Sequence, residues 1–185
     1  MAVIEAIETV ILEADVASVT FATLPTTYQH LQLRSTVKTD RAGSRTDSFG
    51  LVFNSDTGTN YSDHGWYSGG GTATGYATTG KTGAVVYDAT ANGSTSITSV
   101  TDSTWGTSVI DILDYRHANK NTTVSGVGNA TNDAGSGTET VFSAMWSTVG
   151  ALTSIKIECG FYGGANAATV FRRGSSFSLY GLNNS

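Results

Sequence analysis

Cysteine, proline and charged residues are all scarce in this sequence of 185 residues. Its single cysteine, Cys159, excludes an intrachain disulfide framework and a zinc site built from several cysteines. The single proline, Pro25, is expected at a corner before a strand, because proline fixes φ and has no N–H to donate. Charged residues make up only 14%, and Thr, Ser, Gly and Asn are abundant. This composition favours strands and turns over long helices.

Basic stripes and long apolar runs are also missing. Ten basic and fifteen acidic residues give a formal net charge of −5, so binding to a nucleic-acid backbone is not expected. No apolar run approaches the ~20 residues of a membrane-spanning helix. The N-terminus lacks the basic flank and apolar run of a signal peptide. We therefore expect a soluble protein, made in a reducing cytosol, with neither nucleic acid nor membrane as a partner.

The clearest pattern in the chain lies in residues 24–40. Leu31, Leu33 and Val37 alternate with polar residues such as Gln32 and Arg34. A period of two is typical of a strand with one buried and one solvated face. This segment therefore predicts a strand that begins after Pro25.

The N-terminal residues 2–22 allow two interpretations. Some apolar positions fit a helical stripe and others fit a strand. The many β-branched residues favour two strands, while one helix remains an alternative. Residues 2–12 are also a candidate contact with another subunit or a particle, or simply a first strand; the apolar residues concerned are Val3, Ile4, Ile7, Val10 and Leu12.

Further strands are predicted by alternation or by short apolar runs between turn signals. They cover residues 49–54, 84–87, 94–100, 107–115, 124–127, 139–148, 152–159 and 175–182. Residues 54–82 and 129–138 are rich in Gly, Thr and Asn and are predicted to be loops, and the Asn92–Gly93 pair predicts a hairpin turn. The expected architecture is one all-β domain over residues 1–185, a β-sandwich of the jelly-roll type.

Four aromatic residues stand out in the predicted loop 54–82, namely Tyr61, Trp66, Tyr67 and Tyr76. Exposed aromatic side chains could stack on a sugar or on a partner. They could equally pack beneath the loop and hold it in place.

The stretch from Gly75 to Thr82 matches the pattern of a phosphate-cradling loop, G-x-x-x-x-G-K-[ST]. Such a loop needs a buried strand before it and a helix that begins at the lysine. Residues 68–74 predict no strand, and β-branched Val85 and Val86 oppose a helix. Nucleotide binding is therefore not predicted.

Other candidate sites also have simpler explanations. Residues 56–63 offer oxygen atoms to calcium, but they lack the EF-hand spacing, and Asx turns explain the same composition. His30, His64 and His117 lie in separate regions, and His30 is expected on a surface or an interface. We predict no catalytic residue, no cofactor and no metal site.

The faces on which two groups of side chains lie agree with the prediction of no catalytic site. Asp111 and Asp114 fall on opposite faces of a strand, so they cannot form a close acid pair. Cys159 shares a face with Ile155 and Ile157, which predicts a buried structural thiol.

Residues 18–34, 53–62 and 171–182 together resemble a family of tailed-bacteriophage virion proteins. The family is frequent among marine and cyanobacterial phages and ends in a Gly-Ser-x-Phe-x-Leu-Tyr-Gly strand, which here begins at Gly174. The three segments contain 39 of the 185 residues, about a fifth of the chain.

The resemblance implies a non-enzymatic structural protein of the virion, with a jelly-roll or lectin-like sandwich displayed in multiple copies. The expected role is a capsid decoration or cement protein, a homo-oligomer and specifically a trimer, in contact with the major capsid protein or other virion proteins. A tail or tail-fibre component is the alternative. In that role Tyr61, Trp66, Tyr67 and Tyr76 would contact host glycans.

Overall fold

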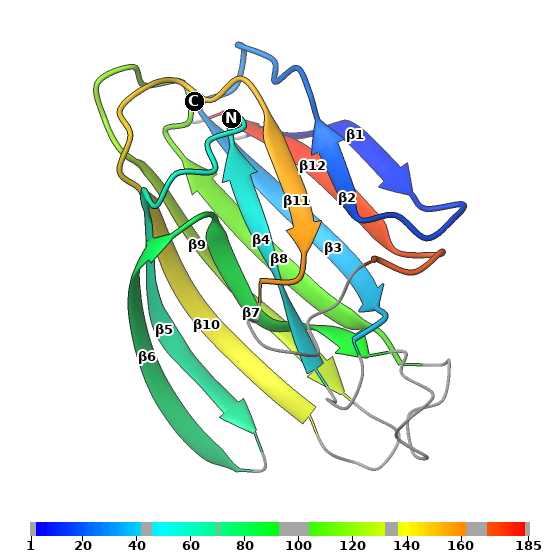
Figure 1. The fold of residues 1–185 in the computed structure, drawn as a ribbon. Helices are drawn as coiled ribbons and strands as arrows, with labels where there is room; N and C mark the ends of the chain where they lie inside the picture. Colours follow the sequence, from blue (N-terminus) through cyan, green and yellow to red (C-terminus); the bar gives the residue numbers. More distant parts are fainter. Residues whose placement is uncertain are drawn as a thin grey trace.

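The computed structural model describes residues 3–41, 46–69, 71–92, 104–131, 137–161 and 170–183. All regular secondary structure in these residues is β-strand (Figure 1). The twelve strands are β1 (Val3–Ile11), β2 (Ser18–Phe21), β3 (His30–Thr39), β4 (Thr46–Phe53), β5 (Tyr61–Gly69), β6 (Thr72–Lys81), β7 (Ala84–Asn92), β8 (Gly106–Leu113), β9 (Thr122–Thr131), β10 (Gly137–Trp146), β11 (Ile155–Cys159) and β12 (Ser176–Asn183).

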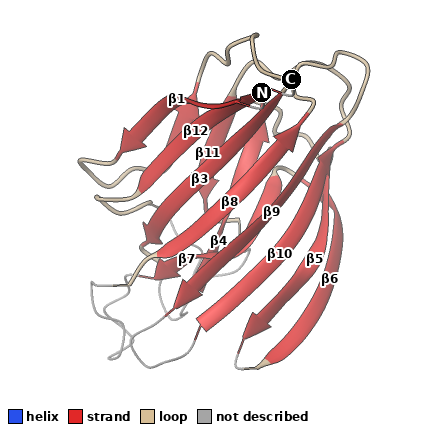
Figure 2. Ribbon diagram, turned by 180° about the vertical axis from the view of Figure 1, so that it is seen from behind, coloured by secondary structure: helices blue, strands red, loops and turns tan. Residues whose placement is uncertain are grey.

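The strands form two antiparallel sheets that pack face to face. The larger sheet has the order β1-β12-β3-β8-β9-β10-β5-β6, and its strands lie side by side in Figure 2. The smaller sheet has the order β2-β11-β4-β7. The two sheets join where the ends of β3 and β7 run parallel, at Lys38–Thr39 and Ala91–Asn92. The predicted β-sandwich is confirmed, whereas this strand order does not establish a jelly roll.

The alternation in β3 shows how the sequence builds the core. Leu31, Leu33 and Val37 are fully buried between the sheets, while Arg34 is exposed on the opposite face. Burial of each such side chain contributes about 1.5–3 kcal/mol. Facing them from the smaller sheet are further buried apolar side chains of β2, β4, β7 and β11, such as Phe21, Phe49, Leu51, Phe53, Val86, Ile155 and Ile157.

The N-terminal segment forms two strands, as the β-branched content predicts. The first of these, β1, pairs only with β12 and is therefore an edge of the larger sheet. Its register shifts between Ala6 and Glu8, where Ile7 is the extra residue. The chain then turns, and β2 pairs with β11 in the smaller sheet.

The prediction of a loop over residues 54–82 is wrong. Strands β5 and β6 form an antiparallel hairpin there, which extends the larger sheet beyond β10. Glycine suggested a loop, but Gly65 lies where a Cβ would overlap the backbone carbonyl of Val141, so glycine lets the two strands approach. Gly71 provides the positive φ of 87° in the hairpin turn. The threonine and tyrosine residues are strong strand formers.

Smaller differences concern the ends of strands. Strand β7 continues through Asn92, beyond the start of the expected turn, and the predicted strand 94–100 lies outside the described residues. Strands β9 and β10 extend into the loop predicted for residues 129–138. Among the described residues, no helix is long and apolar enough to cross a membrane.

The segments that carry the family resemblance pack against one another. Phe177 and Leu179 of β12 are buried in the core, and β12 pairs with β3. A Cβ at Gly181 would overlap the ring of Tyr28, so glycine is required for that close contact. The glycine and apolar positions of the C-terminal motif are therefore explained by packing.

Candidate functional site on the outer face of the larger sheet

An apolar row crosses the solvent-facing side of the larger sheet. Val109 of β8 lies opposite Val127 of β9, which lies opposite Val141 of β10, which in turn lies opposite Trp66 of β5. Residues directly opposite one another on neighbouring strands share a face. All four side chains are exposed, with Trp66 at 42% and Val127 at 51%. This row of four exposed apolar side chains is therefore the candidate for a binding surface on this face.

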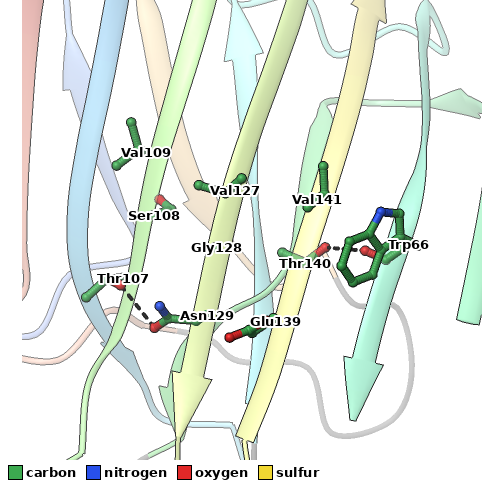
Figure 3. A pocket seen from close by; sticks show the side chains of 10 residues that line it. All are labelled: Trp66, Thr107, Ser108, Val109, Val127, Gly128, Asn129, Glu139, Thr140 and Val141. Atoms are coloured by element: carbon green, nitrogen blue, oxygen red, sulfur yellow. Dashed lines mark hydrogen bonds between the residues drawn. The ribbon is translucent and has the colours of Figure 1, made fainter. Parts of the chain in front are cut away.

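This row forms the floor of a shallow hollow, drawn in Figure 3. We call it hollow A; its volume is about 290 Å³. Its lining comes from β5, β8, β9 and β10, and consists of Trp66, Thr107, Ser108, Val109, Val127, Gly128, Asn129, Glu139, Thr140 and Val141.

A second hollow, hollow B, adjoins the first and has a volume of about 310 Å³. The two hollows share Asn129 and Glu139. The lining of hollow B is polar or glycine and consists of Ser68, Gly71, Asn129, Thr131, Gly137, Thr138 and Glu139. Together the hollows form a track that is apolar at one end and polar at the other.

Polar groups stand at the junction of the two hollows. Thr107 Oγ1 donates a hydrogen bond to Asn129 Oδ1 over 3.0 Å, which engages the amide oxygen and leaves the amide NH₂ to donate. Glu139 lies opposite Asn129 on the next strand and is exposed. The junction therefore presents a fixed donor beside a carboxylate acceptor.

The other side of the apolar row is bordered by a second polar row. Gln32 Nε2 donates to Asp111 Oδ1 over 2.8 Å, and Ser143 Oγ lies 3.0 Å from His64 Nε2. The contact between Ser143 and His64 is like the one between the nucleophile and the base of a hydrolase, but the surroundings of the pair differ from those of a hydrolase site. It lies in the middle of a sheet, where the backbone N–H groups that an oxyanion hole needs are already paired between strands.

Arg34 borders the apolar row, but its side chain points elsewhere. It lies opposite Val109 on β3, but its Nε donates to Gln32 Oε1 over 2.8 Å. Its guanidinium carbon lies 4.8 Å from the ring centre of Tyr180, a cation–π contact. Among the described residues that line hollows A and B, Glu139 has the only ionisable side chain.

The four aromatic residues singled out in the sequence do not form one surface. Tyr61 is buried in the core, where burial raises the pKa of its hydroxyl to about 12. Tyr67 and Tyr76 have ring centres 6.4 Å apart, and Tyr76 packs against the core beneath Gly65. Trp66 alone points to the outer face. The valines that complete the apolar row were missed as site residues, because their common row depends on strand register.

The apolar N-terminal residues also differ in burial, so they do not form one contact surface. Leu12 belongs to the core, and Ile7 and Val10 pack partly against it. Ile4 is 49% exposed, and Ile11, which the sequence did not single out, is 61% exposed. Val3 is the first residue of β1.

The acidic loop after β4 is a hydrogen-bonded turn. Asp56 accepts hydrogen bonds from Gly58 N at 2.9 Å, Asn60 Nδ2 at 2.9 Å, Trp146 Nε1 at 2.7 Å and Thr148 Oγ1 at 3.2 Å. These donors lower the pKa of Asp56 to about 2. Because N–H and O–H donors surround the carboxylate, it is satisfied without a cation. The described residues contain no cluster of three or more potential His, Cys, Asp or Glu metal ligands.

Two of the three histidines stabilise turns. His30 Nδ1 accepts the backbone N–H of Asp114 over 2.9 Å, where the chain has a positive φ of 50°. His117 Nδ1 accepts the N–H of Asn119 over 3.2 Å. Hydrogen bonding by Lys120 lowers the pKa of Asp114.

Cys159 and the phosphate-loop pattern have structural explanations too. Cys159 is partly buried, not fully buried as predicted; its Sγ donates to Ala17 O over 3.3 Å, and burial raises the pKa of the thiol to about 12, which favours the protonated form. The prediction of no strand over residues 68–74 is wrong, because β5 and β6 cover most of this segment; the element after the pattern, however, is strand β7 instead of a helix. The dipole that would hold a phosphate is therefore not supplied there.

No protein-family model matches the sequence, and no curated protein matches it. Two solved structures align weakly with the chain. The alginate lyase vAL-1 from Chlorella virus aligns at 8% identity and a TM-score of 0.35, over 97% of this chain and 84% of the lyase. Supernova, a monomeric photosensitizing fluorescent protein, aligns at 12% identity and a TM-score of 0.18, over 85% of this chain and 60% of that protein. Similarity this low carries no inference about activity.

Proposed function

We propose that this protein is a non-enzymatic structural component of a tailed-bacteriophage particle, a decoration or cement protein displayed on the head as a homo-oligomer. The resemblance of three sequence segments to virion proteins motivates the proposal. The observation that carries it is the unpaired outer edge of β1, which a particle component can use for assembly.

Strand β1 is suited to bind a neighbouring strand. One of its edges pairs with β12, and the N–H and C=O groups of the other edge pair with no strand among the described residues. Ile4 and Ile11 add exposed apolar area on the same strand. An edge of this kind is a template for another chain, either a second copy or the capsid shell.

The charges on β1 restrict which strand can pair with it. Glu8 is exposed, and Glu5 accepts a hydrogen bond from Tyr28 Oη over 2.7 Å. Acidic side chains on an edge oppose unspecific aggregation and permit only a partner whose charges fit. We therefore expect a defined oligomer, a trimer in the proposed arrangement.

A tail or tail-fibre location is the second candidate. Exposed Trp66, at the end of the apolar row, favours it, because a tail protein must contact the host surface. Reconstruction of the purified particle by cryo-electron microscopy separates the two locations. Density at symmetry-related sites on the shell supports decoration, density only on the tail supports the alternative, and absence from the particle contradicts both.

A variant tests the role of β1 directly. Ile4→Lys combined with Ile11→Lys keeps the strand but places two cations at the edge, so we expect loss of the oligomer and of particle binding. Val149→Lys is the matched control, because Val149 is 61% exposed on a loop after β10. Light scattering after size-exclusion chromatography measures the mass. An unchanged mass and unchanged particle binding in the double variant would refute assembly through β1.

A further inference from the structure

We propose that hollows A and B together form a binding site for a neutral oligosaccharide of at least two sugar rings. The proposal concerns the outer face of the larger sheet and does not depend on whether the protein sits on the head or the tail. It rests on the order of apolar and polar groups along the two hollows and on their charge.

The arrangement matches the two faces of a sugar ring. Pyranose rings carry an apolar C–H face and a rim of hydroxyl groups. In hollow A, exposed Trp66 offers a flat apolar surface beside Val141 and Val127. At the rim, Asn129 donates through its amide nitrogen and Glu139 accepts, which are the two roles that a pair of hydroxyl groups can satisfy.

The size of the track favours more than one ring. Each hollow has a volume near 300 Å³, and the two share Asn129 and Glu139. Small-molecule sites typically measure ~300–1,000 Å³. The described lining of hollow B contains no aromatic side chain, and Ser68 and Thr131 share the outer face with Asn129, so hollow B would bind a second ring through hydrogen bonds alone.

The charge of the site selects neutral sugars. Among the described residues that line the two hollows, Glu139 has the only ionisable side chain, and Arg34 is directed to Gln32 and Tyr180. A uronate, a sialic acid or a sulfated sugar would bring a like charge to the carboxylate without a cation to compensate.

A peptide strand fits the site less well. Strands β8, β9, β10 and β5 are each paired on both sides, so their backbone offers no edge for strand addition. Recognition must therefore come from side chains, and these are an aromatic ring, an amide, a carboxylate and hydroxyl groups.

Titration of the ¹⁵N-labelled protein with cellotetraose, maltotetraose, chitotetraose and tetragalacturonate tests the proposal. We expect a neutral tetrasaccharide to shift the amide signals of Thr107, Asn129 and Glu139, and tetragalacturonate to bind more weakly. Trp66→Ala should weaken binding roughly tenfold or more, because it removes the stacking surface. Met145→Ala is the matched control, since Met145 is exposed on β10 but lines neither hollow.

Glu139→Gln separates the role of charge from that of shape. The variant keeps an acceptor, so it should still bind the neutral sugar and should bind tetragalacturonate better than the parent does. Thermal unfolding checks that each variant is folded. The proposal fails if no sugar shifts these signals at about 10 mM, a limit that would still detect millimolar affinity. It also fails if Trp66→Ala and Met145→Ala have equal effects, or if the signals shift with protein concentration alone, which would show a second copy on this face.

Discussion

Replacement of Asp56 by alanine offers a quantitative test of the structure. The carboxylate accepts hydrogen bonds from Gly58, Asn60, Trp146 and Thr148, and these lower its pKa from 3.8 to about 2. At ~1.36 kcal/mol per pKa unit, this shift stabilises the folded state by about 2 kcal/mol above the unfolded pKa. The protonated carboxyl still accepts a neutral hydrogen bond from Trp146 Nε1, and loss of this neutral bond in the variant adds about 1 kcal/mol at every pH. We expect Asp56→Ala to lower the free energy of unfolding by about 3 kcal/mol at neutral pH, roughly 6–12 °C in Tm for a chain of this size.

The pH dependence of this difference is the sharper test. Because the pKa of Asp56 is lower in the folded than in the unfolded protein, its stabilising effect is complete above the unfolded pKa of 3.8. The effect is lost as the pH falls through about 2. The difference between parent and variant should therefore shrink from about 3 kcal/mol near neutral pH to about 1 kcal/mol near the folded pKa.

Urea unfolding followed by far-ultraviolet circular dichroism measures both quantities, since it does not rely on the fluorescence of Trp146. Thr57→Ala is the control, because Thr57 is exposed in the same loop and has no titratable group. A difference that is independent of pH, or one below about 1 kcal/mol at neutral pH, would show that the carboxylate does not hold this loop.

Three further predictions follow from single contacts. Addition of calcium should leave the Tm unchanged, because N–H and O–H donors already satisfy the Asp56 carboxylate; a rise that saturates with calcium would contradict this. Gly181→Ala should lower the free energy of unfolding by about 1–3 kcal/mol, because the new Cβ overlaps the Tyr28 ring. Gly75→Ala should change the free energy of unfolding little, because its Cβ would make only ordinary contact. Equal Tm values for the two variants would refute the close contact. The Cys159 thiol, whose pKa burial raises to about 12, should react with a disulfide reagent only after unfolding in urea, and rapid reaction of the folded protein would contradict this.

Local alternation accounts for the parts of the fold that the sequence predicts. Leu31, Leu33 and Val37 identify both faces of β3, because side chains alternate across a strand whatever it pairs with. The same reasoning locates β8, where Ile110 and Ile112 are buried. Alternation does not identify β5 and β6. A hairpin at the edge of a sheet buries few side chains, so its sequence shows little alternation, and its glycines suggest turns.

The candidate site could be predicted only in part. The sequence identifies Trp66 as a candidate because it is aromatic, but it groups Trp66 with Tyr61 and Tyr76 in one surface. In the structure these two tyrosines face the opposite side of the sheet. The pairing of Trp66 with Val141 across 75 positions depends on the register between β5 and β10. A shift of one residue would turn every one of these side chains to the other face.

Composition and a period of two are local properties, so the amino-acid sequence alone predicts an all-β chain whose apolar residues alternate. The same local patterns place Cys159 on a strand face with Ile155 and Ile157, and they predict that no helix follows the stretch from Gly75 to Thr82. The identity of the edge strands, and of the residues that share the outer face, is visible only in the folded protein. These properties depend on strand order and register, which arise from contacts between segments distant in the chain.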